Sequence, residues 1–283
     1  DETTRIAVDN TGKILRTTDA GTTWITQTSG TTDNLTCVYF SDVNNGTIVG
    51  YSGTILRTTN GGTNWTPLTS GTTKELNGVF FTDTNNGIVV GEFGTILRTT
   101  DAGTTWTIEE ISTTNLLSSV FFTDANNGTI VGEQGTILKS TNGGVTWILQ
   151  ESGVGVALND VYLINENIGF ISGEYGTILK TTNAGITWDS LNSGTTNYLW
   201  SISFPDISTG IIVGSEGIIL KTTDAGLTWS QKLSGTTEWL FSVSFSDANN
   251  GITVGGNTIL RTTNGGDTWN QQISGTSRYL MSV

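Results

Sequence analysis

Histidine is absent from this sequence of 283 residues. It is the commonest general base of enzymes and the commonest metal ligand in proteins. Its absence excludes Ser/His/Asp and Cys/His catalysis, and phosphate-loop, dinucleotide and zinc motifs are absent too. We therefore expect no cofactor and no metal site.

Cysteine and long apolar runs are also scarce. The single cysteine, Cys37, excludes a disulfide within the chain. No apolar run approaches the ~20 residues that a membrane-spanning helix needs, so we expect no direct insertion into a membrane. Residues 1–5 do not form a signal peptide, although a mature secreted chain would also lack one.

Positive charge and proline are the remaining shortages. The 12 Lys and Arg residues face 25 Asp and Glu residues, and the resulting net charge of −13 argues against a nucleic-acid partner. Proline occurs twice and glycine 37 times. This composition favours many short strands joined by tight turns, and hence an all-β protein.

One octapeptide, "TTDAGTTW" in its first copy, recurs seven times in phase. The copies occupy residues 17–24, 58–65, 99–106, 140–147, 181–188, 222–229 and 262–269. Their last residues are Trp24, Trp65, Trp106, Trp147, Trp188, Trp229 and Trp269, spaced by 41 residues except for a final step of 40. A fixed period near 40 with strand-like content indicates a propeller or a β-solenoid.

Each repeat divides into four strands at clear turn signals. In residues 76–112 we expect strands at 76–81, 88–91, 95–99 and 105–111, separated by turns rich in Gly, Asn and Asp. Four antiparallel strands per repeat is the content of one propeller blade. Seven repeats therefore predict a seven-bladed β-propeller that spans residues 1–283 as a single domain.

The two ends of the sequence complement each other. Residue 1 aligns with Asp42, so the chain begins between the first and second strands of a blade, and residues 274–283 align with 29–38. We expect both termini to complete the first blade, which leaves no free sheet edge. We also expect this chain to be part of a longer protein or a larger assembly.

The octapeptide resembles the Asp-box, or BNR, repeat, whose pattern is Ser/Thr-x-Asp/Asn-x-Gly-x-Thr-Trp. With "NNGIVVGEFGTILRTT" before it (residues 85–100), the unit is most similar to the photosystem II stability/assembly-factor-like repeat family. The resemblance covers the whole chain. It implies a propeller fold and, in the best-known members, a role in assembling photosynthetic complexes.

The Asp-boxes are expected to be structural. Their third position holds Asp19, Asn60, Asp101, Asn142, Asn183, Asp224 and Asn264. Asn caps a turn as well as Asp does but is a poorer acid or calcium ligand, so a role that survives the exchange is structural. A ring of cations precedes the boxes: Arg16, Arg57, Arg98, Lys139, Lys180, Lys221 and Arg261. Arg and Lys alternate there, which indicates solvated or turn-pairing residues rather than bidentate anion recognition.

The repeats differ mainly at one face of the ring. We name it the variable face: the turns between second and third strands, such as 92–94, and the loops between blades, such as 110–116. The opposite frame face holds the Asp-boxes and the turns between first and second strands. Function on repeat scaffolds tends to lie where the units differ.

The variable face carries the candidate binding residues. The first strands begin with "NLT", "ELN", "LLS" and "ALN" in four repeats but with "YLW", "WLF" and "YLM" in the next three. These three contribute Tyr198, Trp200, Trp239, Phe241, Tyr279 and Met281, and nearby turns add Tyr51, Phe93 and Tyr175 with Glu92, Glu133, Glu174 and Glu216. Aromatic side chains rimmed by carboxylates suit a sugar, a peptide or a partner loop. The alternative is that they only fill the channel mouth or pack between blades.

A propeller of this kind suits three functions: glycoside hydrolysis, non-catalytic binding, or service as a scaffold. A glycoside hydrolase needs two carboxylates at a set separation, but Glu92, Glu133 and Glu174 lie on successive blades. Sialidase-like chemistry needs clustered arginines, and four of the six arginines sit in the cation ring. We therefore predict a non-catalytic, extracytoplasmic propeller that binds a protein, peptide or glycan. The alternative is a scaffold or assembly-factor subunit of a larger, photosynthetic membrane complex.

Overall fold

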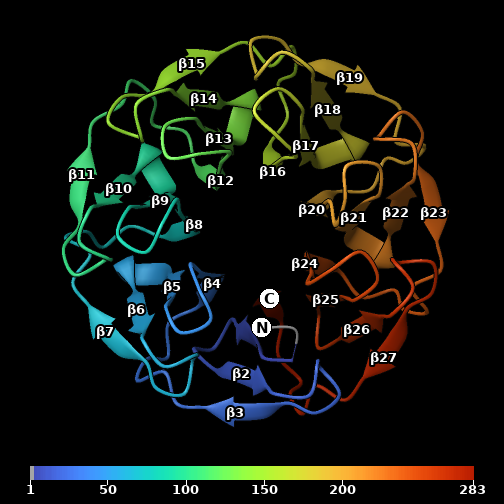
Figure 1. The fold of residues 1–283 in the computed structure, drawn as a ribbon, viewed down its shortest axis with the longest axis horizontal. Helices are drawn as coiled ribbons and strands as arrows, with labels where there is room; N and C mark the ends of the chain where they lie inside the picture. The colour runs from blue at the N-terminus through green and yellow to red at the C-terminus, as the bar shows by residue number, and fades with distance from the viewer. Residues whose placement is uncertain (1–2) are drawn as a thin grey trace.

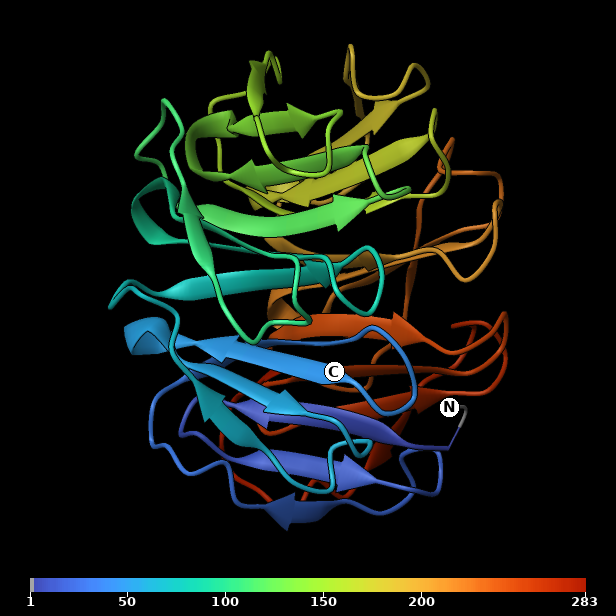
Figure 2. The same ribbon diagram turned by 60° about the vertical axis from the view of Figure 1, so that its left-hand side comes forward.

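A computed structural model describes residues 3–283 as a closed ring of four-stranded antiparallel sheets. Figure 1 shows seven sheets arranged radially around a central channel, and Figure 2 shows the connecting loops gathered at two opposite faces. The predicted seven-bladed, all-β propeller is therefore confirmed. No helix within residues 3–283 has the length and apolarity needed to cross a bilayer.

The strands occupy four concentric positions. The innermost strands are β4 (Leu35–Phe40), β8 (Leu76–Phe81), β12 (Leu117–Phe122), β16 (Leu158–Leu163), β20 (Leu199–Ser203), β24 (Leu240–Phe245) and β28 (Leu280–Ser282). The second strands are β1 (Arg5–Asp9), β5 (Gly46–Gly50), β9 (Gly87–Gly91), β13 (Gly128–Gly132), β17 (Gly169–Gly173), β21 (Gly210–Gly214) and β25 (Gly251–Gly255).

The third and outermost strands complete each sheet. The third strands are β2 (Ile14–Thr17), β6 (Ile55–Thr58), β10 (Ile96–Thr99), β14 (Ile137–Ser140), β18 (Ile178–Thr181), β22 (Ile219–Thr222) and β26 (Ile259–Thr262). The outermost strands are β3 (Ile25–Gln27), β7 (Thr66–Leu68), β11 (Thr107–Glu109), β15 (Ile148–Gln150), β19 (Asp189–Leu191), β23 (Ser230–Lys232) and β27 (Asn270–Gln272). Short 3-10 turns follow five of the second strands: η1 (Tyr51–Gly53), η2 (Glu92–Gly94), η3 (Glu133–Gly135), η4 (Glu174–Gly176) and η5 (Ser215–Gly217).

Both ends of the chain build one sheet, as the sequence predicts. Its strand order is β28-β1-β2-β3, so the innermost strand comes from the end of the sequence. Val8 pairs with Ser282 and Asp9 with Leu280. Every innermost strand is therefore hydrogen-bonded to a second strand, and the ring closes.

The apolar core lies between neighbouring sheets. One cluster joins Val49 and Ile55 of one sheet to Leu76, Val79 and Val89 of the next. Each second strand is buried at all five positions from β5 onward. Burying one such aliphatic side chain contributes about 1.5–3 kcal/mol, so contacts between blades stabilise the ring as a whole.

The outermost strands are shorter than expected. Residues 105–111 were predicted as a strand, but β11 covers only Thr107–Glu109. Trp106 belongs to the Asp-box turn rather than to the strand. β11 is hydrogen-bonded to one neighbouring strand only, and its three residues are exposed, exposed and half-buried in order. Short edge strands limit pairing with other chains.

Hydrogen bonds link four of the innermost strands to the innermost strand of the next blade. The hydroxyls of Ser282, Ser201 and Ser242 accept backbone N–H groups from the next blade, those of Val38, Val243 and Val283. At the equivalent position, Asp160 accepts the Ile202 N–H at 3.0 Å. These bonds fix the register between neighbouring sheets.

Candidate functional site

The Asp-boxes form a side-chain-capped turn between third and outermost strands. Asp19 Oδ1 accepts the Thr23 backbone N–H at 2.8 Å and the Thr17 hydroxyl at 2.7 Å, while Oδ2 accepts the Thr23 hydroxyl. These donors hold the pKa of Asp19 at about 2. Both carboxylate oxygens of Asp19 therefore accept hydrogen bonds from residues of the same turn.

Asparagine preserves this turn by reversing one hydrogen bond. Asn142 Oδ1 accepts the Thr146 N–H at 3.0 Å, and its Nδ2 donates to the Thr146 hydroxyl at 2.9 Å. Asn183 and Asn264 make the same pair of bonds. A threonine hydroxyl either donates or accepts, so the turn accommodates both residues. This geometry explains why either Asp or Asn serves in the boxes that have a threonine four residues later; in the box of Asn60 that position is Asn64, whose N–H donates to Asn60 Oδ1 at 3.0 Å.

The box tryptophans pack edge-on against the innermost strand. Trp65 meets Phe40 with ring centroids 6.0 Å apart at 82°, and four further boxes repeat this T-shaped contact. Gly62 has φ +73°, and a Cβ there would lie 2.6 Å from Ile6 of the preceding blade. The glycine therefore lets the turn seat against its neighbour.

Five members of the cation ring bond to the Asp-box of the next blade: Arg16, Arg98, Lys139, Lys180 and Lys221. Arg16 Nε donates to the Gly61 carbonyl, and Lys180 Nζ donates to the Ala225 carbonyl, each 45 residues further along the chain. Lys221 instead forms an ion pair with Asp267 at 2.9 Å. A backbone carbonyl accepts from either Arg or Lys, which accounts for their alternation. The frame face is thus tied together by its own side chains.

The turns of the variable face project their central residue outward. Phe93 and Tyr175 occupy these centres with φ of 55° and 54°. The left-handed region is unfavourable for bulky residues, so each turn holds its ring at a conformational cost. Backbone bonds from Glu92 N to Glu75 O and from Glu174 N to Ala157 O fix the turns to the adjoining loops.

Six aromatic side chains of the variable face form one contiguous group, which we name the aromatic cluster. It comprises Tyr175, Tyr198, Trp200, Trp239, Phe241 and Tyr279. Its centre is the stacked pair Trp200 and Trp239, with centroids 6.1 Å apart and planes at 29°. Tyr175 meets Tyr198 at 5.2 Å on one side, and Phe241 meets Tyr279 at 6.3 Å on the other.

The aromatic cluster has a half-buried floor and an exposed rim. Trp200 and Phe241 are half-buried, and Met281 lies half-buried at the equivalent position of β28. Tyr175, Trp239 and Tyr279 are 60%, 46% and 54% exposed. The floor agrees with the expectation of side chains that fill the channel mouth, whereas the rim leaves aromatic surface open to solvent.

The other predicted residues lie apart from this cluster. Tyr51 is exposed, and its pKa is raised by burial and by the charge of Glu75. The pKa of Glu75 is itself raised by burial and by Glu92. Phe93 carries Lys74 Nζ 4.1 Å from its ring centroid. Glu133 is exposed on the blade that lies between those of Phe93 and Tyr175. The predicted aromatic residues therefore form two groups, the aromatic cluster on one side of this blade and Tyr51 with Phe93 on the other.

A second aromatic row was not predicted from the sequence. Tyr39, Phe80, Phe121 and Tyr162 stand at one repeat position of consecutive innermost strands, with centroid distances of 4.8, 5.0 and 4.9 Å. The next two blades hold Ser203 and Ser244 there. This change from aromatic residues to serine is visible in the sequence, but the contacts between rings of neighbouring blades are seen only in the structure.

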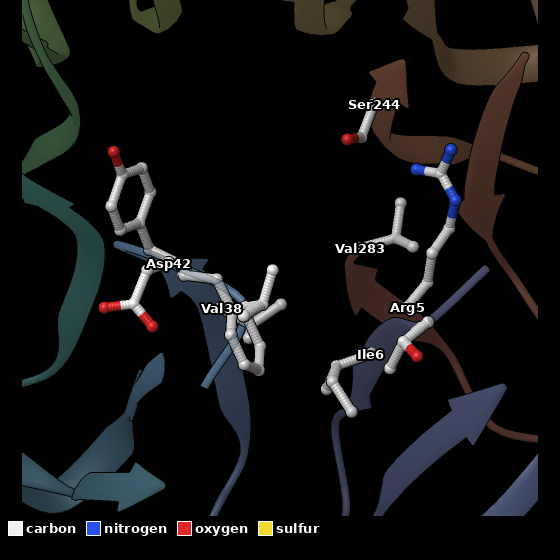
Figure 3. Close-up of a pocket in the computed structure, with 10 residues that line it drawn as sticks. Arg5, Ile6, Val38, Asp42, Ser244 and Val283 are labelled. Carbon is white, nitrogen blue, oxygen red and sulfur yellow. The ribbon is translucent and has the colours of Figure 1, made fainter. Parts of the chain in front are cut away.

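A cavity of about 440 Å³ opens beside this row, at the frame face. Arg5, Ser244 and Val283 lie across it from Val38 and Asp42 (Figure 3). Burial lowers the pKa of Arg5, although Asp247 opposes that shift. Across residues 3–283, no three His, Cys, Asp or Glu side chains converge to hold a metal ion.

Solved structures with this fold include both assembly factors and hydrolases. YCF48 bound to D1 peptide is 19% identical with a TM-score of 0.70, and the match covers 84% of this chain and 80% of that one. YCF48 from Cyanidioschyzon merolae is 20% identical with a TM-score of 0.69 and 84% coverage of both chains. The GH74 xyloglucanase from Xanthomonas campestris is 14% identical with a TM-score of 0.79, covering 99% of this chain but 52% of that one. Identities this low show a shared fold alone.

Sequence comparison identifies the family. No curated protein matches the chain significantly in sequence. The family model described as photosynthesis system II assembly factor YCF48 matches in five overlapping stretches, at residues 17–114, 62–150, 105–195, 149–235 and 187–275. Together these stretches span residues 17–275 and include all seven Asp-boxes. The chain therefore belongs to the photosynthesis system II assembly factor YCF48 family.

Proposed function

We propose that this propeller is a protein-binding factor of the assembly type, which holds an extended segment of a partner protein on its aromatic cluster. The observation that carries the proposal is the concentration of six contacting aromatic residues on adjacent blades of the variable face. On the frame face, by contrast, Asp-box side chains and members of the cation ring are hydrogen-bonded or ion-paired within the chain.

Family membership supports the assembly-factor alternative over a free-standing glycan-binding domain. A propeller of similar fold is known with a peptide bound, which supports a peptide as the ligand class here. We extend the proposal to a transient role: the chain would hold a partner segment while a larger complex forms.

The aromatic cluster is suited to a peptide by its shape and rigidity. Aromatic rings supply large contact areas at low cost in side-chain entropy, and Trp and Tyr dominate binding hot spots for that reason. The Trp200–Trp239 pair is held by Tyr198 and Phe241 on either side, so little ordering is needed on binding. A preorganised surface loses less affinity to ordering.

We further propose that the protein is not an enzyme and acts outside the cytoplasm. The absence of histidine and the separation of the glutamates over successive blades support a non-catalytic role. The GH74 xyloglucanase of similar fold is matched over 52% of its length, at 14% identity. The low cysteine content and the abundance of Thr, Asn and Gly support an extracytoplasmic location, which cell fractionation would test.

Binding to peptide and glycan arrays tests the proposal. Trp200→Ala and Trp239→Ala should each weaken peptide binding by about tenfold or more, the cost typical of a central aromatic anchor. Ile148→Ala is the matched control, because Ile148 is an exposed apolar residue on outer strand β15. Peptide binding that survives both tryptophan substitutions, binding to glycans alone, or no binding would contradict the proposal.

A further inference from the structure

Carboxylates without a cationic partner surround the aromatic cluster. Glu174 precedes Tyr175, Glu216 occupies the exposed centre of turn η5, and Glu238 precedes Trp239. Among residues 3–283, the only ion pairs closer than 4.0 Å join Asp267 to Lys221 and Lys232 on the frame face. Within residues 3–283, the carboxylates beside the aromatic cluster therefore form no ion pair closer than 4.0 Å.

Glu238 lies against the rim of the cluster. A Cβ added at Gly256 would meet Glu238 Oε2 at 2.5 Å and Tyr279 Cε1 at 3.5 Å, so the carboxylate and the tyrosine ring flank the same backbone position. At the other end, the charge of Glu174 contributes to the raised pKa of Tyr198, after its hydrogen bond to Tyr175 and burial. Carboxylate charge thus reaches both ends of the cluster.

In the opposite half of the variable face, an aromatic ring with carboxylates nearby is in contact with a cation. There the chain supplies its own cation: Lys74 Nζ lies 4.1 Å from the centroid of Phe93, next to Glu75 and Glu92. Of the cations in residues 3–283, none lies over a ring of the aromatic cluster.

We infer that the aromatic cluster receives a basic side chain, Arg or Lys, of the bound peptide. The inference rests on the proposed function and names the ligand residue that this site selects. The electron-rich faces of Trp and Tyr attract a cation, and Glu174, Glu216 and Glu238 add an electrostatic attraction that selects against acidic segments. A metal ion is disfavoured as the cation because no three carboxylates converge within residues 3–283.

The test uses blocked ten-residue peptides of one sequence, in which two positions hold Arg, Gln or Glu. Affinity is measured by calorimetry at 50 mM and 300 mM NaCl, with wild type, a Glu174→Gln/Glu216→Gln/Glu238→Gln triple variant and a Glu110→Gln control. Glu110 is exposed beyond the outer strand β11 and away from the cluster. Wild type should bind the Arg peptide about tenfold or more tightly than the Gln peptide, and the Glu peptide least.

Three results separate the possible failures. The Arg-over-Gln preference should shrink by about threefold or more in the triple variant and at high salt, but not in Glu110→Gln. Equal affinity for the Arg and Gln peptides, with both lost in Trp200→Ala, would overturn the basic-residue inference while leaving the peptide site intact. Absence of binding to all three peptides and to the arrays would overturn both.

Discussion

At the scale of single residues, the Asp-box turn is defined by a hydrogen-bonding pattern rather than by a charge. Asp and Asn satisfy the same backbone N–H, and the neighbouring threonine changes from donor to acceptor. This exchange could be predicted from the repeats themselves. The partners of the cation ring could not, because Arg16 reaches Gly61 only through the stacking of successive blades.

Asp19→Asn tests this account through its pH dependence. The folded pKa of Asp19 is about 2, against about 3.9 in an unfolded chain, so its stabilising contribution is complete above the unfolded pKa and is lost as pH falls through about 2. We expect Asp19→Asn to match wild type in its urea midpoint at pH 7. Between pH 7 and pH 2.5 its midpoint should fall less than that of wild type.

Asp19→Ala is the comparison, because alanine leaves the Thr23 N–H and hydroxyl without their acceptor. Its midpoint at pH 7 should lie below both others. If Asn were as damaging as Ala at pH 7, the carboxylate charge would matter and the structural interpretation of the boxes would be wrong.

At the scale of strands, side chains of several innermost strands bond to the innermost strand of the next blade. Asp160 is the most heavily used: Oδ1 accepts from the Ser119 hydroxyl and the Val161 N–H, and Oδ2 accepts from the Ile202 N–H. Burial raises its pKa despite these donors. The strand positions were predictable from turn signals, but these inter-blade bonds depend on the angle between sheets, which no local pattern encodes.

Asp160→Ala should destabilise the propeller by about 2–4 kcal/mol, since a buried donor left without a partner costs about 1–3 kcal/mol and several are affected. Ser119→Ala removes one of the same hydrogen bonds and should cost about 1 kcal/mol. Chemical denaturation measures both free energies of unfolding. A cost below about 0.5 kcal/mol for Asp160→Ala would show that the inner ring contributes little.

At the scale of the whole molecule, the two faces of the ring divide structure from recognition. The seven-bladed fold and its closure by both termini follow from period and phase, because each repeat can bury its apolar strands only against its neighbours. The aromatic cluster was foreseen from the three aromatic triplets and Tyr175, which lie on neighbouring blades. The separation of the cluster from Tyr51 and Phe93 was not foreseen. The position of a residue within its repeat tells on which face it lies, but not which aromatic rings are in contact.

The most direct test of this division is hydrogen–deuterium exchange of the protein with and without a bound peptide from the array. We expect slower amide exchange in residues 174–176, 192–201 and 233–241, which carry or adjoin Tyr175, Trp200 and Trp239, and unchanged exchange in the seven Asp-boxes. Protection confined to the Asp-boxes and neighbouring frame-face turns would contradict the assignment of binding to the variable face.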